Sequence, residues 1–190
     1  MRKKDLARKI TGWMTLGIFA IHPSLTFAAE ILPDTSAPIE HQPQVLETAN
    51  GLPLVQITTP SAGGVSMNLY SFFNVPERGA ILNNSYSLSA TKLAGYVQGN
   101  PNLMNGAAKL IVNEVTSTNP SNLRGFLEVA GEKAGVVIAN PNGILADGAG
   151  FLNTARVTLA TGRTEMDAAG NLKALRVEGG KIRITGNGLN

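Results

Sequence analysis

The side chains that most often carry catalysis are few in this sequence and are spread along it. There is no cysteine, and the two histidines are His22 and His41. This composition excludes a thiol nucleophile, a disulfide framework and a multi-histidine metal site. Carboxylates are spread singly across the predicted turns and strand faces, and we expect them to be solvated. They are Glu114, Glu128, Glu132, Asp147, Glu165, Asp167 and Glu178. The sequence therefore predicts a protein that is not an enzyme and uses neither a metal nor a cofactor.

Two glycine-rich patterns also fail to form a ligand site. Asp147-Gly-Ala-Gly150 lacks the further acidic ligands of a calcium loop, and we interpret it as a tight turn. The glycine pairs at 63–64 and 179–180 precede no predicted helix, which argues against a phosphate-binding loop. A pair of acids that cleaves a polysaccharide stays open as an alternative, because sequence spacing does not say which carboxylates meet in space.

Two asparagine-proline motifs have the clearest local chemistry. They are Asn100-Pro101-Asn102-Leu103 and Asn140-Pro141-Asn142-Gly143-Ile144. Asparagine caps a turn through its side chain, proline presets φ, and an Asn-Gly pair favours left-handed backbone geometry. Both motifs therefore predict tight turns between extended segments.

The elements that must position these turns are short strands. Runs of alternating or β-branched apolar residues end at glycine-rich and asparagine-rich turns, and none is long enough for a proper helix. The predicted strands are 52–57, 65–72, 110–115, 126–129, 136–139, 156–160 and 181–185. The sequence thus predicts an all-β fold.

A faint internal repeat favours one all-β architecture. Asn-Pro pairs begin at residues 100, 119 and 140, which are 19 and 21 residues apart. A turn that recurs at such a period between short strands is typical of a solenoid of stacked parallel β-coils. Ile182 and Ile184 alternate with charged neighbours and are expected to point into its core. An ordinary β-sandwich is the alternative.

Aromatic residues divide the predicted domain into two parts. Residues 50–100 are expected to form an N-terminal β cap and the first strands, and 101–190 to form the β-helix rungs, with an open C-terminal end. The expected cap holds Tyr70, Phe72, Phe73, Tyr86 and Tyr96. Such a cap would cover an otherwise open sheet edge.

The first residues have the pattern of a secretory signal peptide. Basic residues at 2–9 precede a short apolar stretch and small residues at 26–29. We predict a signal peptide over 1–28, with cleavage between Ala28 and Ala29, and an extended or flexible lead-in over 29–49. Export through the Sec pathway to the periplasm follows, and no later segment is predicted to span a membrane.

Cleavage would change the charge of the protein. Five of the 16 basic residues and one of the 13 acidic residues lie within 1–28, which leaves 11 basic and 12 acidic residues. The remaining net charge is near −1, and no basic run survives. Nucleic-acid binding is therefore not predicted, because it needs a basic face.

Taken together in order, several segments resemble the two-partner secretion domain of large Gram-negative exoproteins, the family of filamentous haemagglutinins, contact-dependent inhibition toxins and secreted haemolysins. The two asparagine-proline motifs resemble the paired NPNL and NPNGI motifs of that domain. The resemblance covers residues 50–190 and includes Asn50-Gly-Leu-Pro53, Ile81-Leu-Asn-Asn84, Ile111-Val-Asn-Glu-Val115, Glu128-Val-Ala-Gly131 and Val157-Thr-Leu-Ala-Thr-Gly-Arg163.

The resemblance implies a right-handed parallel β-helix with an N-terminal cap. It implies a partner, an outer-membrane β-barrel transporter with POTRA domains, and a product that is secreted or displayed at the cell surface. The two motifs would then determine secretion competence, either by contact with the transporter or by holding the fold. A passenger beyond this segment would meet host or neighbouring cells. A carbohydrate-binding or receptor-binding adhesin acting by itself is the alternative function.

Overall fold

A computed structural model describes residues 30–190. The predicted signal peptide and its cleavage site at Ala28 and Ala29 lie outside these residues. Within them the only helical elements are two single-turn 3-10 helices, η1 (Ile39–His41) and η2 (Pro101–Leu103). No helix among the described residues is long and apolar enough to cross a membrane.

Three sheets form the body of the molecule. The first holds, in spatial order, β1 (Ile31–Pro33), β4 (Val65–Phe73), β8 (Leu110–Val115), β11 (Ala134–Ala139) and β14 (Thr154–Ala160). The second holds β13 (Gly150–Leu152), β10 (Phe126–Gly131), β5 (Ala80–Asn84), β3 (Pro53–Gln56) and β2 (Gln44–Glu47). The third holds β17 (Ile182–Ile184), β12 (Ile144–Ala146) and β9 (Ser121–Leu123).

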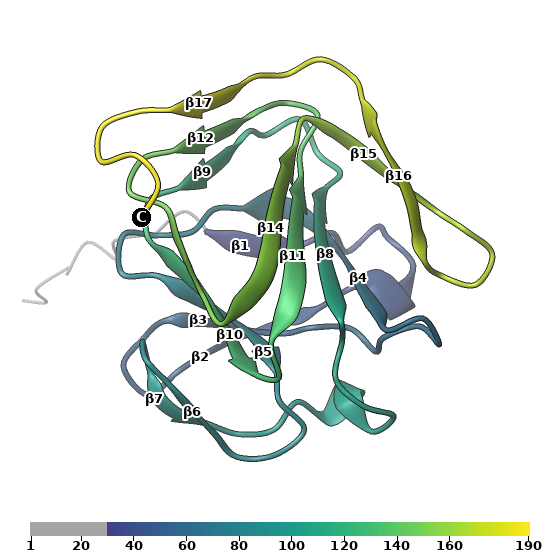
Figure 1. Cartoon of the computed structure of the whole chain (residues 1–190), viewed down its shortest axis with the longest axis vertical. Coiled ribbons are helices and arrows are strands. Elements are labelled where there is room, and N and C mark those ends of the chain that lie inside the picture. The colour runs from purple at the N-terminus through teal and green to yellow at the C-terminus, as the bar shows by residue number, and fades with distance from the viewer. Residues whose placement is uncertain (1–29) are drawn as a thin grey trace, which may run out of the picture.

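The chain visits the three sheets in a repeating order. From β8 to β14 it passes from the first sheet to the third and then the second, so three strands complete one coil (Figure 1). Each coil pairs in parallel with the next in all three sheets. The solenoid prediction is confirmed, because this arrangement is a parallel β-helix.

The coil length is not constant along the chain. Between the coil of β8–β10 and the coil of β11–β13, paired residues are 25 apart in the first sheet, 24 in the second and 23 in the third. The step from β11 to β14 is 20 to 21 residues, and the step from β4 to β8 is 45. The spacing of 19 to 21 between asparagine-proline pairs therefore matches one of these steps, and the pairs themselves occupy unequal places on their coils. Asn140 directly follows β11, whereas Asn119 comes four residues after the end of β8.

The interior of the coil is apolar. Inward side chains from all three sheets form one buried cluster, which includes Val55, Leu82, Ile111, Leu127 and Ile138. Because inward residues are stacked coil on coil, each coil buries its neighbour's apolar face. Most predicted strands end within two residues of the observed ones, and 110–115 coincides with β8.

Buried amides bridge neighbouring coils inside the first sheet. Asn113 Nδ2 donates to the Val137 carbonyl at 3.2 Å, and Asn113 Oδ1 accepts from the Tyr70 hydroxyl at 3.0 Å. Asn68 on the preceding coil likewise donates to the Val112 carbonyl. Burial raises the pKa of the Tyr70 phenol well above its usual value, so this hydroxyl stays a donor.

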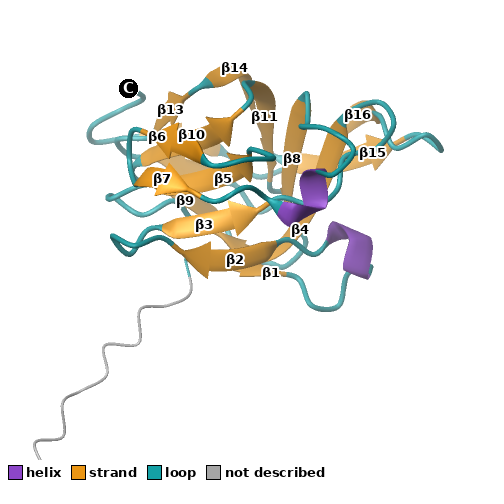
Figure 2. Cartoon of the chain, turned by 90° about the horizontal axis from the view of Figure 1, so that it is seen from below, coloured by secondary structure: helices purple, strands orange, loops and turns teal. Residues whose placement is uncertain are grey.

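Two antiparallel hairpins cover the outside of the coil. The β6–β7 hairpin, made of β6 (Ser89–Thr91) and β7 (Gly95–Val97), packs on the outer face of the second sheet (Figure 2). The β15–β16 hairpin, made of β15 (Gly162–Met166) and β16 (Leu172–Val177), packs on the outer face of the first. Each hairpin buries a second apolar layer outside the helix.

Within the segment 29–49, expected as an extended or flexible lead-in, the described residues 30–49 contribute two strands to the sheets. β1 pairs antiparallel with β4, and β2 pairs antiparallel with β3. Ile31 joins the main core and Val45 packs against it. These two strands cover the N-terminal edges of the first two sheets, edges that would otherwise present unpaired backbone groups.

Four residues expected in apolar surroundings are exposed instead. Tyr86 and Tyr96, placed in the cap by their aromatic character, have 64% and 74% of their surface exposed. Tyr96 lies in β7 opposite Ala90, whereas Leu93, Ala94 and Val97 of the hairpin pack on the sheet. Tyr86 lies in the segment between β5 and β6. Ile182 and Ile184 are also exposed, because β17 is an edge strand with a neighbour, β12, on one side only.

We predict that Asn113→Ala lowers the free energy of unfolding by about 3 kcal/mol, because it leaves the buried Tyr70 hydroxyl and Val137 carbonyl without partners. Urea denaturation measures the loss. The exposed Asn105→Ala is the control and should change stability by less than about 0.5 kcal/mol. Equal effects of the two substitutions would contradict the role given to the amide.

A second prediction concerns acid stability. The Ser36 hydroxyl and then the Thr116 hydroxyl donate to Asp34 and hold the pKa of its carboxyl below 3.8. A lowered folded-state pKa gives stability that is complete above pH 4 and is lost as pH falls through the folded pKa. Asp34→Asn should therefore cost about 1 kcal/mol at pH 6. The difference from wild type should shrink steadily below pH 4, as measured by urea midpoints.

Candidate functional site

The first asparagine-proline motif forms the corner between β7 and β8. Asn100, with 3% of its surface exposed, accepts a hydrogen bond on Oδ1 from the Asn102 backbone N–H at 3.0 Å. Its Nδ2 donates to the carbonyls of Ile57 and Asn83 at 2.9 and 3.0 Å. One side chain thus closes its own turn and satisfies two carbonyls of earlier strand ends.

The rest of this motif supports the same corner. Asn102 Nδ2 donates to the Ile57 carbonyl at 2.9 Å. Pro101 is the first residue of η2, a position whose N–H would have no partner within the helix, so the proline loses no hydrogen bond there. Leu103 is buried in the main core. The neighbouring Met104 is almost fully exposed.

The second motif repeats this geometry between β11 and β12. Asn140 is fully buried, and its Oδ1 accepts from the Asn142 backbone N–H at 2.9 Å. Its Nδ2 donates to the Asn119 carbonyl and to Ser121 Oγ, both at 2.9 Å. Asn142 Nδ2 donates to the Ser117 carbonyl at 2.7 Å. Each motif therefore ties its corner to the preceding coil or strand.

Gly143 and Ile144 complete the second turn. Gly143 has φ of +111°, a backbone conformation that favours glycine. A Cβ placed there would come 3.0 Å from the Lys181 carbonyl. Ile144 is buried in the main core as the first residue of β12.

The structure does not bring the two motifs together. The short helix of the first motif lies beside the start of β8, and the turn of the second follows the end of β11 (Figure 1). Because β8 and β11 are parallel neighbours, the motifs sit at opposite ends of the first sheet. Of the two motifs, Pro101 and Asn142 present the most surface to solvent.

Two carboxylates that the sequence placed on solvated faces are buried instead. Glu114 and Glu128 have 6% and 4% of their surface exposed. Glu128 accepts the backbone N–H groups of Lys92 and Leu93, and Glu114 accepts the N–H and hydroxyl of Thr164. No local signal marks this burial, because a polar residue that alternates with apolar ones in a strand ordinarily faces solvent.

The other acidic turn is also structural. Asp147 Oδ1 accepts the backbone N–H of Asn187 at 2.8 Å, which joins the β12–β13 turn to the last turn of the chain. Among residues 30–190, no group of three or more His, Cys, Asp or Glu side chains is placed to hold a metal ion.

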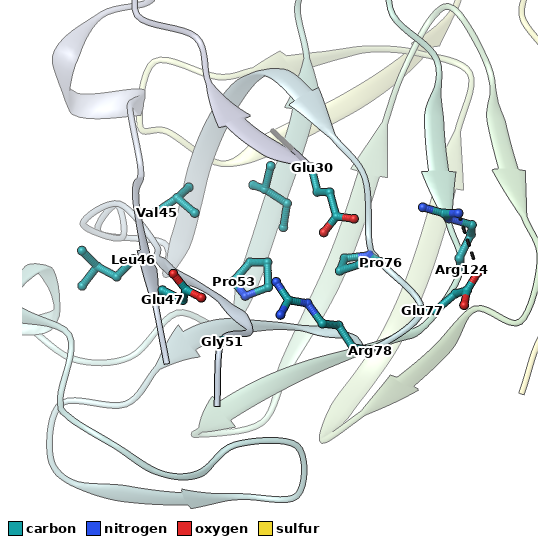
Figure 3. A pocket seen from close by; sticks show the side chains of 11 residues that line it. Glu30, Val45, Leu46, Glu47, Gly51, Pro53, Pro76, Glu77, Arg78 and Arg124 are labelled. Atoms are coloured by element: carbon teal, nitrogen blue, oxygen red, sulfur yellow. Dashed lines mark ion pairs between the residues drawn. The ribbon is translucent and has the colours of Figure 1, made fainter. Parts of the chain in front are cut away.

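A groove lies away from both motifs, at the N-terminal end of the coil. Its volume is about 740 Å³, and it lies beside β1 and β2. Figure 3 shows the side chains of Glu30, Glu47 and Arg78 around its opening. Ile31, Val45, Pro53 and Pro76 give it apolar walls, and Arg124 pairs with Glu77 at 3.7 Å along one side.

Comparison with known proteins identifies the class of this fold. The family model of the TPS secretion domain matches residues 29–190. That match begins before residue 50 and so includes the segment that forms β1 and β2. The crystal structure of a filamentous haemagglutinin secretion domain superposes with a TM-score of 0.76 at 39% identity, covering 84% of this chain and 51% of that one.

Three curated relatives carry the CdiA name. Toxin CdiA of Yersinia pestis is 51% identical over 166 residues, which are 87% of this chain. The 16S rRNA endonuclease CdiA of Enterobacter cloacae is 48% identical over 194 residues, spanning all of this chain. The tRNA nuclease CdiA-2 of Burkholderia pseudomallei is 45% identical over 189 residues, or 95% of this chain.

This chain spans only 5 to 6% of the length of these relatives, so their enzymatic names describe much longer proteins. What they share with this chain is the segment that the family model and the solved structure cover. The chain therefore belongs to the two-partner secretion (TPS) domain family: it is a structural secretion module of the CdiA and filamentous haemagglutinin type, which implies an outer-membrane transporter as partner and a secreted or surface-associated product.

Proposed function

We propose that this module is exported by the Sec pathway and is then engaged in the periplasm by the POTRA domains of its transporter before it passes through the transporter barrel. The basic and apolar pattern of residues 1–28 supports the first step. Short parallel strands with free backbone edges support the second, since a transporter domain could pair with such segments by β-augmentation before the coil closes.

In this proposal the asparagine-proline motifs act through the fold rather than by contact with the transporter. The observation that carries it is the burial of Asn100 and Asn140, whose amides make three and four hydrogen bonds within the chain. A partner would reach little of either side chain. Loss of either amide would instead open a corner between coils.

The two ends of the coil have different roles in the proposal. β1 and β2 close the N-terminal edges as a cap. At the other end β13, β14 and β17 each have a strand neighbour on one side only, so the coils of a passenger could pair there. The exposed Ile182 and Ile184 would then be covered by the next coil.

The relatives favour one kind of passenger. All three are CdiA proteins, so a contact-dependent inhibition toxin is the first candidate, and a haemagglutinin-like adhesin is the second. In both, contact with a neighbouring or host cell would belong to the passenger. The module itself would supply export and the template for folding.

The test is secretion of the full chain with and without a cognate transporter, with culture medium assayed against periplasm. We expect transporter-dependent release, lowered at least tenfold by Asn100→Ala and by Asn140→Ala. Both variants should also lose about 2 kcal/mol of unfolding free energy, because buried backbone carbonyls lose their donors. Circular dichroism and urea denaturation measure the second effect.

Two control variants separate fold from contact. Asn105→Ala lies on the exposed loop just after the first motif, and Pro101→Ala alters the exposed residue of the motif itself. Both should be secreted as wild type. A folded, fully stable Asn100→Ala or Asn140→Ala that is not secreted would instead assign the motifs to transporter contact. Release without any transporter would overturn the secretion role.

One observation favours direct binding as a second function. Tyr86 and Leu88, in the segment just before β6, and Tyr96 in β7 are large apolar residues that are exposed. Exposed aromatic faces can stack on sugar rings, as an adhesin requires. Purified protein should then bind members of an oligosaccharide array, and Tyr86→Ser combined with Tyr96→Ser should abolish that binding. Absence of binding by the wild type would remove this candidate.

A further inference from the structure

The β6–β7 hairpin is attached to the coil by an apolar underside and by very few polar contacts at its tip. Leu93, Ala94 and Val97 pack on outward side chains of the second sheet, which come from Leu54, Ile81 and Ala130. These three strand residues belong to β3, β5 and β10, so the hairpin lies across three successive strands.

At the tip of the hairpin, two backbone N–H groups bind a buried carboxylate instead of the carbonyl groups of a neighbouring strand. Glu128 Oε1 accepts the Lys92 N–H at 2.7 Å, and Oε2 accepts the Leu93 N–H at 2.9 Å. Asn50 Nδ2 adds one exposed hydrogen bond to the Leu93 carbonyl. A carboxylate that is 4% exposed and bonded by two N–H groups is costly to leave unpaired.

The base of the hairpin is held independently of that tip. Asn83 Nδ2 donates to the Gln98 carbonyl, and Asn100 N donates to the Ser85 carbonyl. Both contacts lie within the coil corner that the first asparagine motif closes. The tip can therefore separate from the sheet while the base stays in place.

We propose that the β6–β7 hairpin is a strap that opens and closes on the second sheet, and that the Glu128 carboxylate is its catch. The proposal rests on contacts within this chain and does not depend on transporter recognition.

Chain order gives the strap a conformational role. The hairpin precedes β10 in the sequence, while Leu54 and Ile81 on β3 and β5 precede the hairpin. Until β10 pairs with β5, the hairpin can cover those two apolar residues but has no carboxylate to bind. Closure of the strap therefore marks completion of the coil that contains β10.

The β15–β16 hairpin is also held by a buried carboxylate, but here the carboxylate comes before the hairpin in the sequence. Glu114 on β8 accepts the backbone N–H of Thr164 in β15 at 2.9 Å, and Arg163 lies 3.6 Å from its other oxygen. Here the catch precedes the hairpin along the chain. Two separate hairpins held by buried carboxylates from central strands indicate a common device rather than an isolated contact.

The test is hydrogen exchange of individual amides in Glu128→Gln. Glutamine keeps the shape of the side chain but has one acceptor oxygen, so one of the Lys92 and Leu93 N–H groups loses its partner. We expect exchange at Lys92 and Leu93 to accelerate at least tenfold, with faster tryptic cleavage after Lys92. Exchange at Val112 and Val137 in the first sheet should stay at the wild-type rate.

Glu132→Gln is the matched control, because Glu132 is an exposed acid four residues further along the same chain segment. It should leave exchange throughout the hairpin unchanged. If Glu128→Gln does not fold, Leu93→Ala replaces it, since it weakens the strap from the hairpin side without touching a coil strand. Unchanged exchange at the tip, or equal acceleration in the hairpin and in Val112 and Val137, overturns the proposal.

Discussion

The buried asparagine amide at a coil corner is the interaction on which the rest of this structure depends. Each corner interrupts a parallel ladder and leaves carbonyl groups that must find donors. Asn84, Asn100 and Asn140 each accept a backbone N–H on Oδ1 and donate twice from Nδ2, bridging to an adjacent strand or coil. An amide offers donors and an acceptor in one plane, which neither a hydroxyl nor a carboxylate does. Corners held in this way keep the strands of successive coils in register. Correct register keeps the apolar side chains pointing into the core, because a slip of one residue would turn them outward.

The outer surface adds a second constraint. Several outward side chains of the two large sheets are apolar, and the two hairpins cover them as separate small cores. Each of these hairpins forms a two-stranded sheet of its own and pairs with no strand of the coil, so its backbone needs another acceptor where it meets the coil. Glu114 and Glu128 supply that acceptor from central strands. The module is thus a coil with two hairpins packed on its outside. These hairpins can detach without breaking hydrogen bonds between the strands of the coil.

Many strands and both asparagine corners could be predicted from local pattern, because period-two alternation and turn chemistry act over a few residues. The errors share a cause. Short strands such as β1 and β2 have weak patterns and form by pairing with distant partners. Tyr96 is exposed because the hairpin packs on the sheet through Leu93, Ala94 and Val97. Glu114 is buried because the β15–β16 hairpin, which comes much later in the sequence, packs over it. Glu128 is buried because the β6–β7 hairpin, which comes well before it, packs over it.

By itself the sequence determined the all-β class, the positions of the main strands, the tight turns at Asn100 and Asn140, and the family resemblance. These depend on residue type and short spacing. The tertiary structure alone decided that both asparagines are buried donors between coils, that the two motifs lie at opposite ends of one sheet, and which carboxylates hold the hairpins. Those facts depend on contacts between residues tens of positions apart, and no local pattern encodes which distant backbone group a side chain will meet.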